Sequence, residues 1–112
     1  MNTVLPTAFN LATYFANNPS GYMLKNESVE VTLKVKGYAM DVLKRHALGK
    51  DQSINVLDNY WSEVTFTILP TYDLIAWILR YAADVECVYP KFLRAKVKKV
   101  LQQTLSLYAM EQ

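Results

Sequence analysis

The clearest pattern along this chain is an alternation of apolar and polar residues at positions 29–36. The apolar positions are Val29, Val31, Leu33 and Val35, and the polar ones are Glu30, Thr32, Lys34 and Lys36. Because successive side chains of a strand point to opposite faces, the alternation predicts a strand with one buried and one solvated face. Gly37 ends this strand. A helical stripe then covers residues 38–48, and we expect Gly49 to cap that helix in the left-handed conformation.

Two further strands and two further helices are predicted in the rest of the chain. Strands over residues 53–57 and 63–69 are joined by a turn containing Asp58 and Asn59, two residue types that tolerate turn backbone angles. A helix over 73–83 and a short strand over 85–89 follow. Pro90 suits the first turn of a last helix, which runs to Tyr108. Its apolar positions line up as one stripe: Leu93, Val97, Val100, Leu101, Leu105 and Tyr108.

The predicted order of elements is β-α-β-β-α-β followed by a C-terminal helix. This order is typical of the α+β, ferredoxin-like arrangement, in which two helices cover one face of a four-stranded antiparallel sheet. The other face is then left to solvent or to a partner. Residues 1–26 are predicted to form a lead-in with a short helix at about 10–17, and residues 27–112 to form the domain.

The composition indicates one soluble domain. The 112 residues are 52% hydrophobic and 20% charged, which excludes disordered and fibrous classes. The apolar runs are shorter than the roughly 20 residues that a membrane helix needs, and no signal pattern is present. We therefore expect a cytoplasmic protein without membrane contact. The single cysteine, Cys87, cannot form an internal disulfide, and its apolar strand predicts a small buried hydrophobe.

Several motifs of the chain resemble one bacterial family. They are LIAWILRY at 74–81, DVECVYP at 84–90 and FLR at 92–94, preceded by FNLATYF at 9–15 and VEVTLKV at 29–35. In this order and spacing they resemble the C-terminal extension domain, or WCX domain, of WYL-domain transcriptional regulators. Relatives often carry a glycine after the Trp-bearing helix. This chain has Ala82 and Ala83 there, which predicts a turn built differently.

The resemblance implies a ligand-responsive, usually dimeric regulator of transcription. The DNA-reading helices and the WYL barrel that normally precede this domain are absent from the chain, so the resemblance implies DNA contact through other parts of a longer protein. The hypothesis is a regulatory and oligomerisation domain, a homodimer, that helps couple effector sensing to DNA binding. The alternative is a free-standing sensor module that binds a small molecule between sheet and helices.

The last helix carries the main candidate site. Residues 90–112 contain five basic residues against one acidic residue, whereas the rest of the chain is slightly acidic. Clustered basic residues attract phosphate, so we predict contact with a nucleic acid or a nucleotide effector at Arg94, Lys98, Lys99 and Lys91. Two alternatives remain open. The lysines can simply solvate the outer face of the helix, and Arg94 can form an ion pair with Asp84 or Glu86.

Four aromatic residues are candidate interface positions. Trp61 and Tyr60 lie in the predicted hairpin loop, where exposed aromatics often anchor partners, although they can also fold back over the sheet. Trp77 and Tyr81 are one helical turn apart beside the buried stripe. Packing at the edge of the core and a share in an interface are both open for this pair.

No residue pattern indicates catalysis, a metal or a cofactor. His46 has no second histidine, cysteine or acidic partner at ligand spacing. RNA-recognition domains need aromatics on the open sheet face, but the outward positions here are Glu30, Thr32, Lys34, Asn55, Thr65 and Thr67. Acylphosphatase-like enzymes need a glycine-rich anion loop after the first strand, which is also missing. We therefore expect a protein that is not an enzyme.

Overall fold

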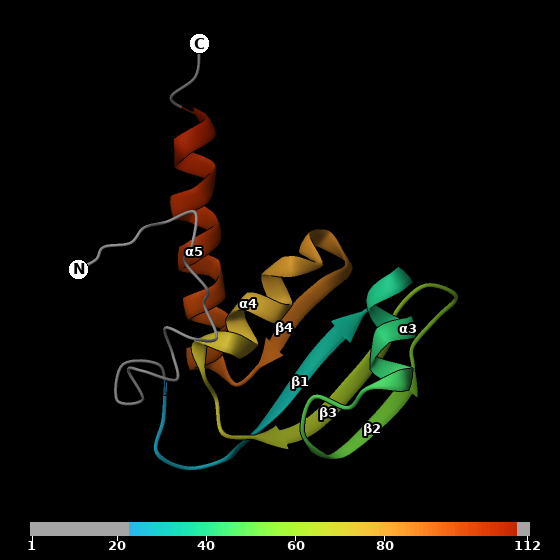
Figure 1. The fold of residues 1–112 in the computed structure, drawn as a ribbon. Coiled ribbons are helices and arrows are strands. Elements are labelled where there is room, and N and C mark those ends of the chain that lie inside the picture. The colour runs from blue at the N-terminus through green and yellow to red at the C-terminus, as the bar shows by residue number, and fades with distance from the viewer. Residues whose placement is uncertain (1–22, 110–112) are drawn as a thin grey trace, which may run out of the picture.

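The computed structural model describes residues 23–109, which form a four-stranded antiparallel sheet and three helices (Figure 1). The strands are β1 (Val29–Val35), β2 (Lys50–Val56), β3 (Ser62–Ile68) and β4 (Val85–Tyr89). The helices are α3 (Gly37–Arg45), α4 (Tyr72–Arg80) and α5 (Lys91–Ala109), with a short 3-10 turn η2 (Ala82–Asp84) before β4. The strand order is β2-β3-β1-β4. The predicted α+β, ferredoxin-like fold is thus confirmed, while the predicted lead-in helix lies outside the described residues.

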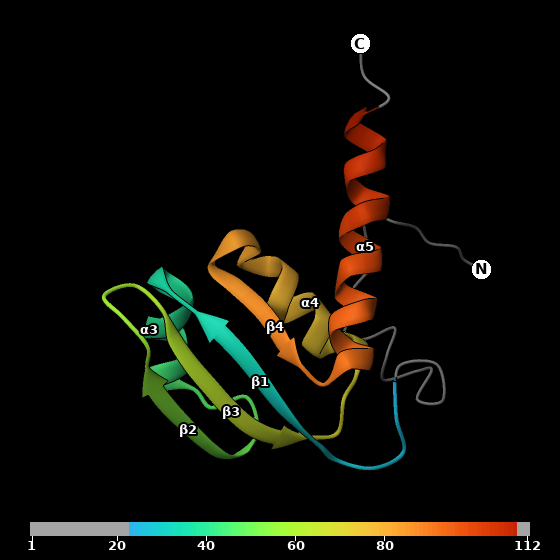
Figure 2. The same ribbon diagram turned by 180° about the vertical axis from the view of Figure 1, so that it is seen from behind.

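The helices are unevenly placed around the sheet. α3 and α4 pack on the same face, whereas α5 starts at the end of β4 and extends well beyond the sheet (Figures 1 and 2). No helix within residues 23–109 is long and apolar enough to cross a lipid bilayer.

The core lies between the sheet and the helices, and the alternating strand pattern predicts it correctly. Val31, Leu33 and Val35 of β1 are fully buried, and they pair in register with Phe66, Val64 and Ser62 of β3. Burying one such apolar side chain contributes roughly 1.5–3 kcal/mol. The helices and β4 supply the other buried apolar residues: Ala39, Met40, Leu43, Leu74, Ile75, Ile78, Val85, Cys87, Leu93 and Val97.

The prediction for Gly49 is wrong. α3 ends at Arg45, and its C-cap residue is His46, which has an extended backbone. Gly49 instead passes close to β3, because a Cβ atom on it would lie 2.4 Å from the carbonyl oxygen of Thr67. The glycine is required by this close approach of two backbones, and not by a left-handed cap. Gly37, with φ of 64°, does make the turn from β1 into α3.

The edge strand β2 contributes no buried residue to the core. A bulge interrupts its pairing with β3 between Lys50 and Ser53, and Asp51 there has a positive φ of 56°. The side chain of Gln52 ties the strand to the end of α3. Its Nε2 donates to the carbonyl of Leu43 (3.1 Å), and its Oε1 accepts from the amide of Leu48 (3.0 Å).

The predicted stripe of α5 is buried only in its first half. Leu93 and Val97 lie in the core, but Leu101 is 51% exposed, Leu105 is 68% exposed and Tyr108 is 65% exposed. The physical reason is the position of the helix, whose second half has run past the sheet and past α4 (Figure 2). Helical periodicity defines which residues share a face, but it does not say whether anything covers that face.

Candidate functional site

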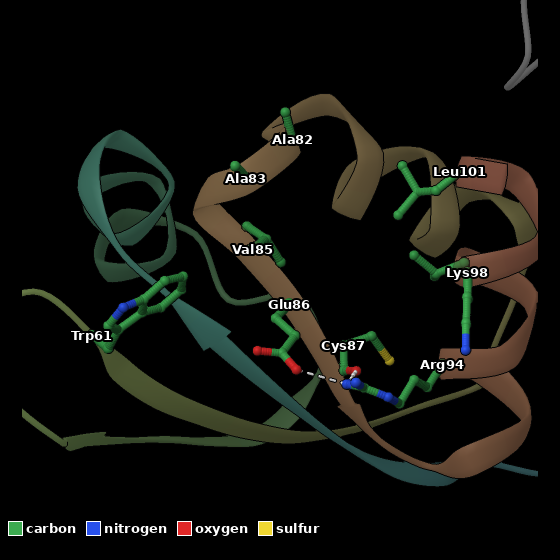
Figure 3. Close-up of a pocket in the computed structure, with 10 residues that line it drawn as sticks. Trp61, Ala82, Ala83, Val85, Glu86, Cys87, Arg94, Lys98 and Leu101 are labelled. Carbon is green, nitrogen blue, oxygen red and sulfur yellow. Dashed lines mark hydrogen bonds and ion pairs between the residues drawn. The ribbon is translucent and has the colours of Figure 1, made fainter. Parts of the chain in front are cut away.

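A pocket of about 470 Å³ lies between β4, η2 and α5 (Figure 3). Its size falls in the range of small-molecule sites. The lining is mostly apolar, with three charged side chains at its edge: Trp61, Ala82, Ala83, Val85, Cys87, Val97 and Leu101 together with Glu86, Arg94 and Lys98. Two of the four predicted basic contacts, Arg94 and Lys98, therefore lie at one hollow of the surface.

Arg94 joins α5 to β4. Its Nη1 donates to Oε2 of Glu86 (2.7 Å) and to the carbonyl oxygen of Cys87 (2.8 Å), as Figure 3 shows. The hydrogen bond and the charge of Glu86 raise the pKa of Arg94, so the guanidinium stays charged. Both side chains are about half exposed, so the ion pair adds little stability and acts mainly to orient the guanidinium at the pocket. Glu86 is one of the two partners that the sequence left open.

The three lysine candidates on α5 differ in their placement. Lys98 borders the pocket, whereas Lys91 and Lys99 are exposed and lie outside its lining. Within residues 23–109, the pair of Arg94 with Glu86 is the only ion pair. The lysines therefore have no carboxylate partner there that would compete with an incoming anion.

Cys87 forms an inert part of the pocket wall. Burial raises the pKa of its thiol from 9.0 to about 11, and the nearby charge of Arg94 only partly opposes this shift. A thiol that stays protonated near neutral pH is a poor nucleophile. The prediction that Cys87 is a small buried hydrophobe is confirmed, since the residue is 3% exposed.

Trp61 is held over the open face of the sheet by the β2–β3 loop. Oδ1 of Asp58 accepts hydrogen bonds from the amides of Trp61 (2.7 Å) and Tyr60 (2.8 Å), which lower the pKa of this carboxyl. The Nζ atoms of Lys34 and Lys36 lie 5.3 and 4.9 Å from the Trp61 ring centroid. Such cation–π contacts orient the indole. Tyr60 itself is 76% exposed.

Trp77 and Tyr81 lie apart from the pocket. Their ring centroids are 4.7 Å apart, and the ring of Tyr38 on α3 is 6.3 Å from that of Tyr81. These contacts connect α4 to α3 at the edge of the core, which favours a packing role. Of the four aromatic candidates, only Trp61 reaches the pocket.

Some features of the site could not be predicted. The sequence indicates Lys34 and Lys36 only as outward positions of a strand, because their contact with Trp61 depends on the conformation of the hairpin loop. The pocket itself has no local sequence signal. His46 is exposed, and among residues 23–109 no three His, Cys, Asp or Glu side chains come together as a metal site.

The described residues thus form a four-stranded ferredoxin-like domain with an added C-terminal helix and an apolar-lined pocket. Comparison with protein families makes this more specific, because the family model described as the WCX domain matches residues 27–105. The chain therefore belongs to the WCX domain family. WCX domains are found in WYL-family regulators. Searches of curated proteins and of solved structures gave no significant match.

Proposed function

We propose that this chain is the regulatory domain of a WYL-family transcriptional regulator, acting in the bacterial cytoplasm. In this role the domain assembles with a second copy and helps pass an effector signal to DNA-binding parts of the protein. The observation that supports the proposal is the WCX match over residues 27–105, which coincides with the continuous fold from β1 to α5. No catalytic step belongs to the proposal.

The effector contact that we propose lies on the basic side of α5. Arg94 is oriented at the pocket by Glu86, and Lys91 and Lys98 lie on the same side of the helix because the three residues are spaced by three and four positions. Lys99 is adjacent to this side. So few cations can neutralise only a few phosphates of a nucleic acid or nucleotide. Binding is therefore expected to be weak and independent of base sequence.

The test is a fluorescence titration of a single-stranded oligonucleotide at several salt concentrations. For single strands, the logarithm of the affinity falls with the logarithm of salt by about 0.7 per neutralised phosphate. Replacing Lys91, Lys98 and Lys99 by Gln is expected to flatten this dependence. Arg94 is retained because its loss would also loosen α5 from β4. The matched control replaces Lys44 and Arg45 of α3 by Gln and leaves the slope unchanged. Absence of binding at low salt would contradict the proposed contact.

The self-association that we propose uses the open side of the sheet near the β2–β3 loop. Trp61 is fixed there by Asp58 and two lysines, and Tyr60 projects next to it with 76% of its surface exposed. A rigid aromatic of this kind is a typical anchor at an interface. Sedimentation at high micromolar concentration is expected to show a dimer that Tyr60→Ala weakens and Tyr38→Ala does not. A chain that stays monomeric throughout would contradict this part of the proposal.

A second candidate function is supported by the pocket of about 470 Å³. Its apolar wall fits a small organic anion, because Lys98 at its edge has no carboxylate partner among the described residues, whereas Arg94 is paired with Glu86. Such an anion is the ligand expected of a free-standing sensor. A thermal-shift screen with nucleotides and carboxylates tests it. A ligand that stabilises the protein, and whose effect is lost in Lys98→Met but kept in Lys44→Met, would favour the sensor. A uniform lack of response would leave the regulatory domain as the better account.

A further inference from the structure

The outer half of α5 carries an apolar face that the described part of the chain leaves uncovered. Leu101, Leu105 and Tyr108 are spaced by four and three residues and continue the face of Leu93 and Val97 that packs in the core. All residues of α5 from Leu101 to Ala109 are exposed. Together, the three side chains form an apolar surface that we call the α5 stripe.

Charge separates the two halves of this helix. The five basic residues of α5 all lie between Lys91 and Lys99, and residues 100–109 contain no charged side chain. A solvent-exposed helix face normally carries charged residues. The outer half of α5 has the composition of a helix with a covering partner.

The first described residues, 23–25, lie beside the first turn of α5. Met23 forms a β-bridge with Thr71, and the amide of Leu24 donates to the carbonyl of Pro70 (2.9 Å). Nζ of Lys25 then lies 4.7 Å from the centroid of the Phe92 ring in the first turn of α5. Residues 1–22 are therefore joined to the described chain next to the N-terminal end of α5.

The sequence of residues 1–22 matches the α5 stripe in chemistry and in reach. It has no charged side chain, and four large apolar residues fall within residues 9–15: Phe9, Leu11, Tyr14 and Phe15. From Met23 back to Phe15 an extended chain spans about 26 Å. Along α5, the distance from Phe92 to Leu105 is about 20 Å at the rise of an α-helix. The aromatic segment can therefore reach the stripe.

We propose that residues 9–15 dock on the α5 stripe of their own chain and so extend the hydrophobic core along the outer half of α5. The short connection favours this over a second copy, because tethering raises the effective concentration of the segment to the millimolar range. The docked segment shields leucines that would otherwise face water. It also links whatever precedes the domain in the chain to the helix that carries the basic residues.

Disulfide trapping tests the contact directly. A chain with Phe15→Cys and Leu105→Cys is oxidised at low micromolar concentration as an equal mixture of ¹⁴N- and ¹⁵N-labelled protein. The matched control carries Phe15→Cys and Gln103→Cys, since Gln103 lies on the opposite side of α5. Buried Cys87 stays reduced in both. The proposal expects an intrachain disulfide that forms about tenfold faster than in the control.

Two outcomes of this experiment would overturn the proposal. Disulfides that join labelled to unlabelled chains would show that a second copy covers the stripe. Equal rates in the test and control chains would show random collision of a tethered segment.

Hydrogen exchange supplies a second, independent measurement. Replacing Phe9, Tyr14 and Phe15 by Ser is expected to speed amide exchange of residues 100–109 about tenfold, because local opening of the helix becomes easier. Exchange in β1 and β3 should not change. The control replaces Asn10, Thr13 and Asn17 by Ser and has no effect. Unchanged exchange in α5 after loss of the aromatic side chains would also overturn the proposal.

Discussion

The two edge strands of the sheet, β2 and β4, differ sharply in what they contribute. β2 has seven residues and buries none of them, whereas β4 has five residues and buries Val85 and Cys87. β4 is covered by α5 and joined to it through Arg94, while β2 is held by pairing to β3 and by the side chain of Gln52. Of the two edge strands, only β4 thus contributes to the core, and the candidate site lies on its side of the sheet.

The β4 edge of the sheet carries the candidate site, whereas the β2 edge is open and bulged. The pocket and the start of α5 lie at the β4 edge, so a ligand there acts on well-packed structure. The β2 edge is open, and the bulge at Asp51 leaves only residues 53–56 in regular pairing with β3. Short or bulged edges of this kind limit unwanted strand pairing.

The largest expected effect is on the free energy of unfolding, which should respond differently to substitutions at the β4 edge and at the β2 edge. Leu93→Ala, at the point where α5 meets the core, is expected to cost about 2–5 kcal/mol through lost burial and a cavity. Ile54→Ala on β2 is expected to cost less than about 1 kcal/mol, since Ile54 is already 40% exposed. Urea unfolding of both variants measures the difference. Equal costs would mean that β2 is buried by a partner in solution.

The second effect concerns thiol chemistry at the two edges. At pH 8, Cys87 is expected to react with iodoacetamide about 100-fold more slowly than a thiol of ordinary pKa, because its pKa of about 11 leaves little thiolate. A cysteine placed at the exposed position Ser53 supplies the comparison, and comparable reaction rates at both sites would contradict a buried Cys87.

The raised pKa of Cys87 also makes the free energy of unfolding depend on pH. The folded thiol keeps its proton between pH 9.0 and about 11, where the unfolded thiol has lost it, so stability falls as pH rises through this window.

The smallest effect is expected at the turn that leads into β4. Ala82 adopts a positive φ of 50°, a conformation that strains a residue with a Cβ atom. Ala82→Gly is therefore expected to stabilise the domain by about 0.5–1 kcal/mol. Ala83→Gly, at a neighbouring position without positive φ, should be neutral or destabilising. Thermal unfolding compares the two, and a loss of stability in Ala82→Gly would show that the turn is not strained.

The same turn illustrates how far the sequence could be followed. The missing glycine predicted a turn built differently, and the structure shows Ala82 in this turn with a positive φ of 50°. The alternation at β1 and β3 was predictable because a strand of period two needs only one buried face. Gly49 was not, since its role depends on the carbonyl of Thr67, which is distant in the sequence.

The site was less predictable than the fold. The sequence predicted an ion pair of Arg94 with either Asp84 or Glu86, because only β4 and the short connection into α5 separate Arg94 from these acidic residues. The contact of Trp61 with Lys34 and Lys36 joins the β2–β3 loop to the end of β1, and no local pattern encodes it. The uncovered half of α5 was missed for a related reason, since periodicity describes a helix and not its neighbours.

The strand order has a consequence for the time course of folding. β2 and β3 are close in the chain, so their hairpin can form within microseconds, whereas Leu33 of β1 must find Cys87 of β4 across most of the domain. Closing that long loop is entropically costly and comes late. The pocket needs β4 and α5 in place, so it exists only in the fully folded chain. A ligand that fills it would therefore bind no partly folded form, and would raise the population of the native state by mass action alone.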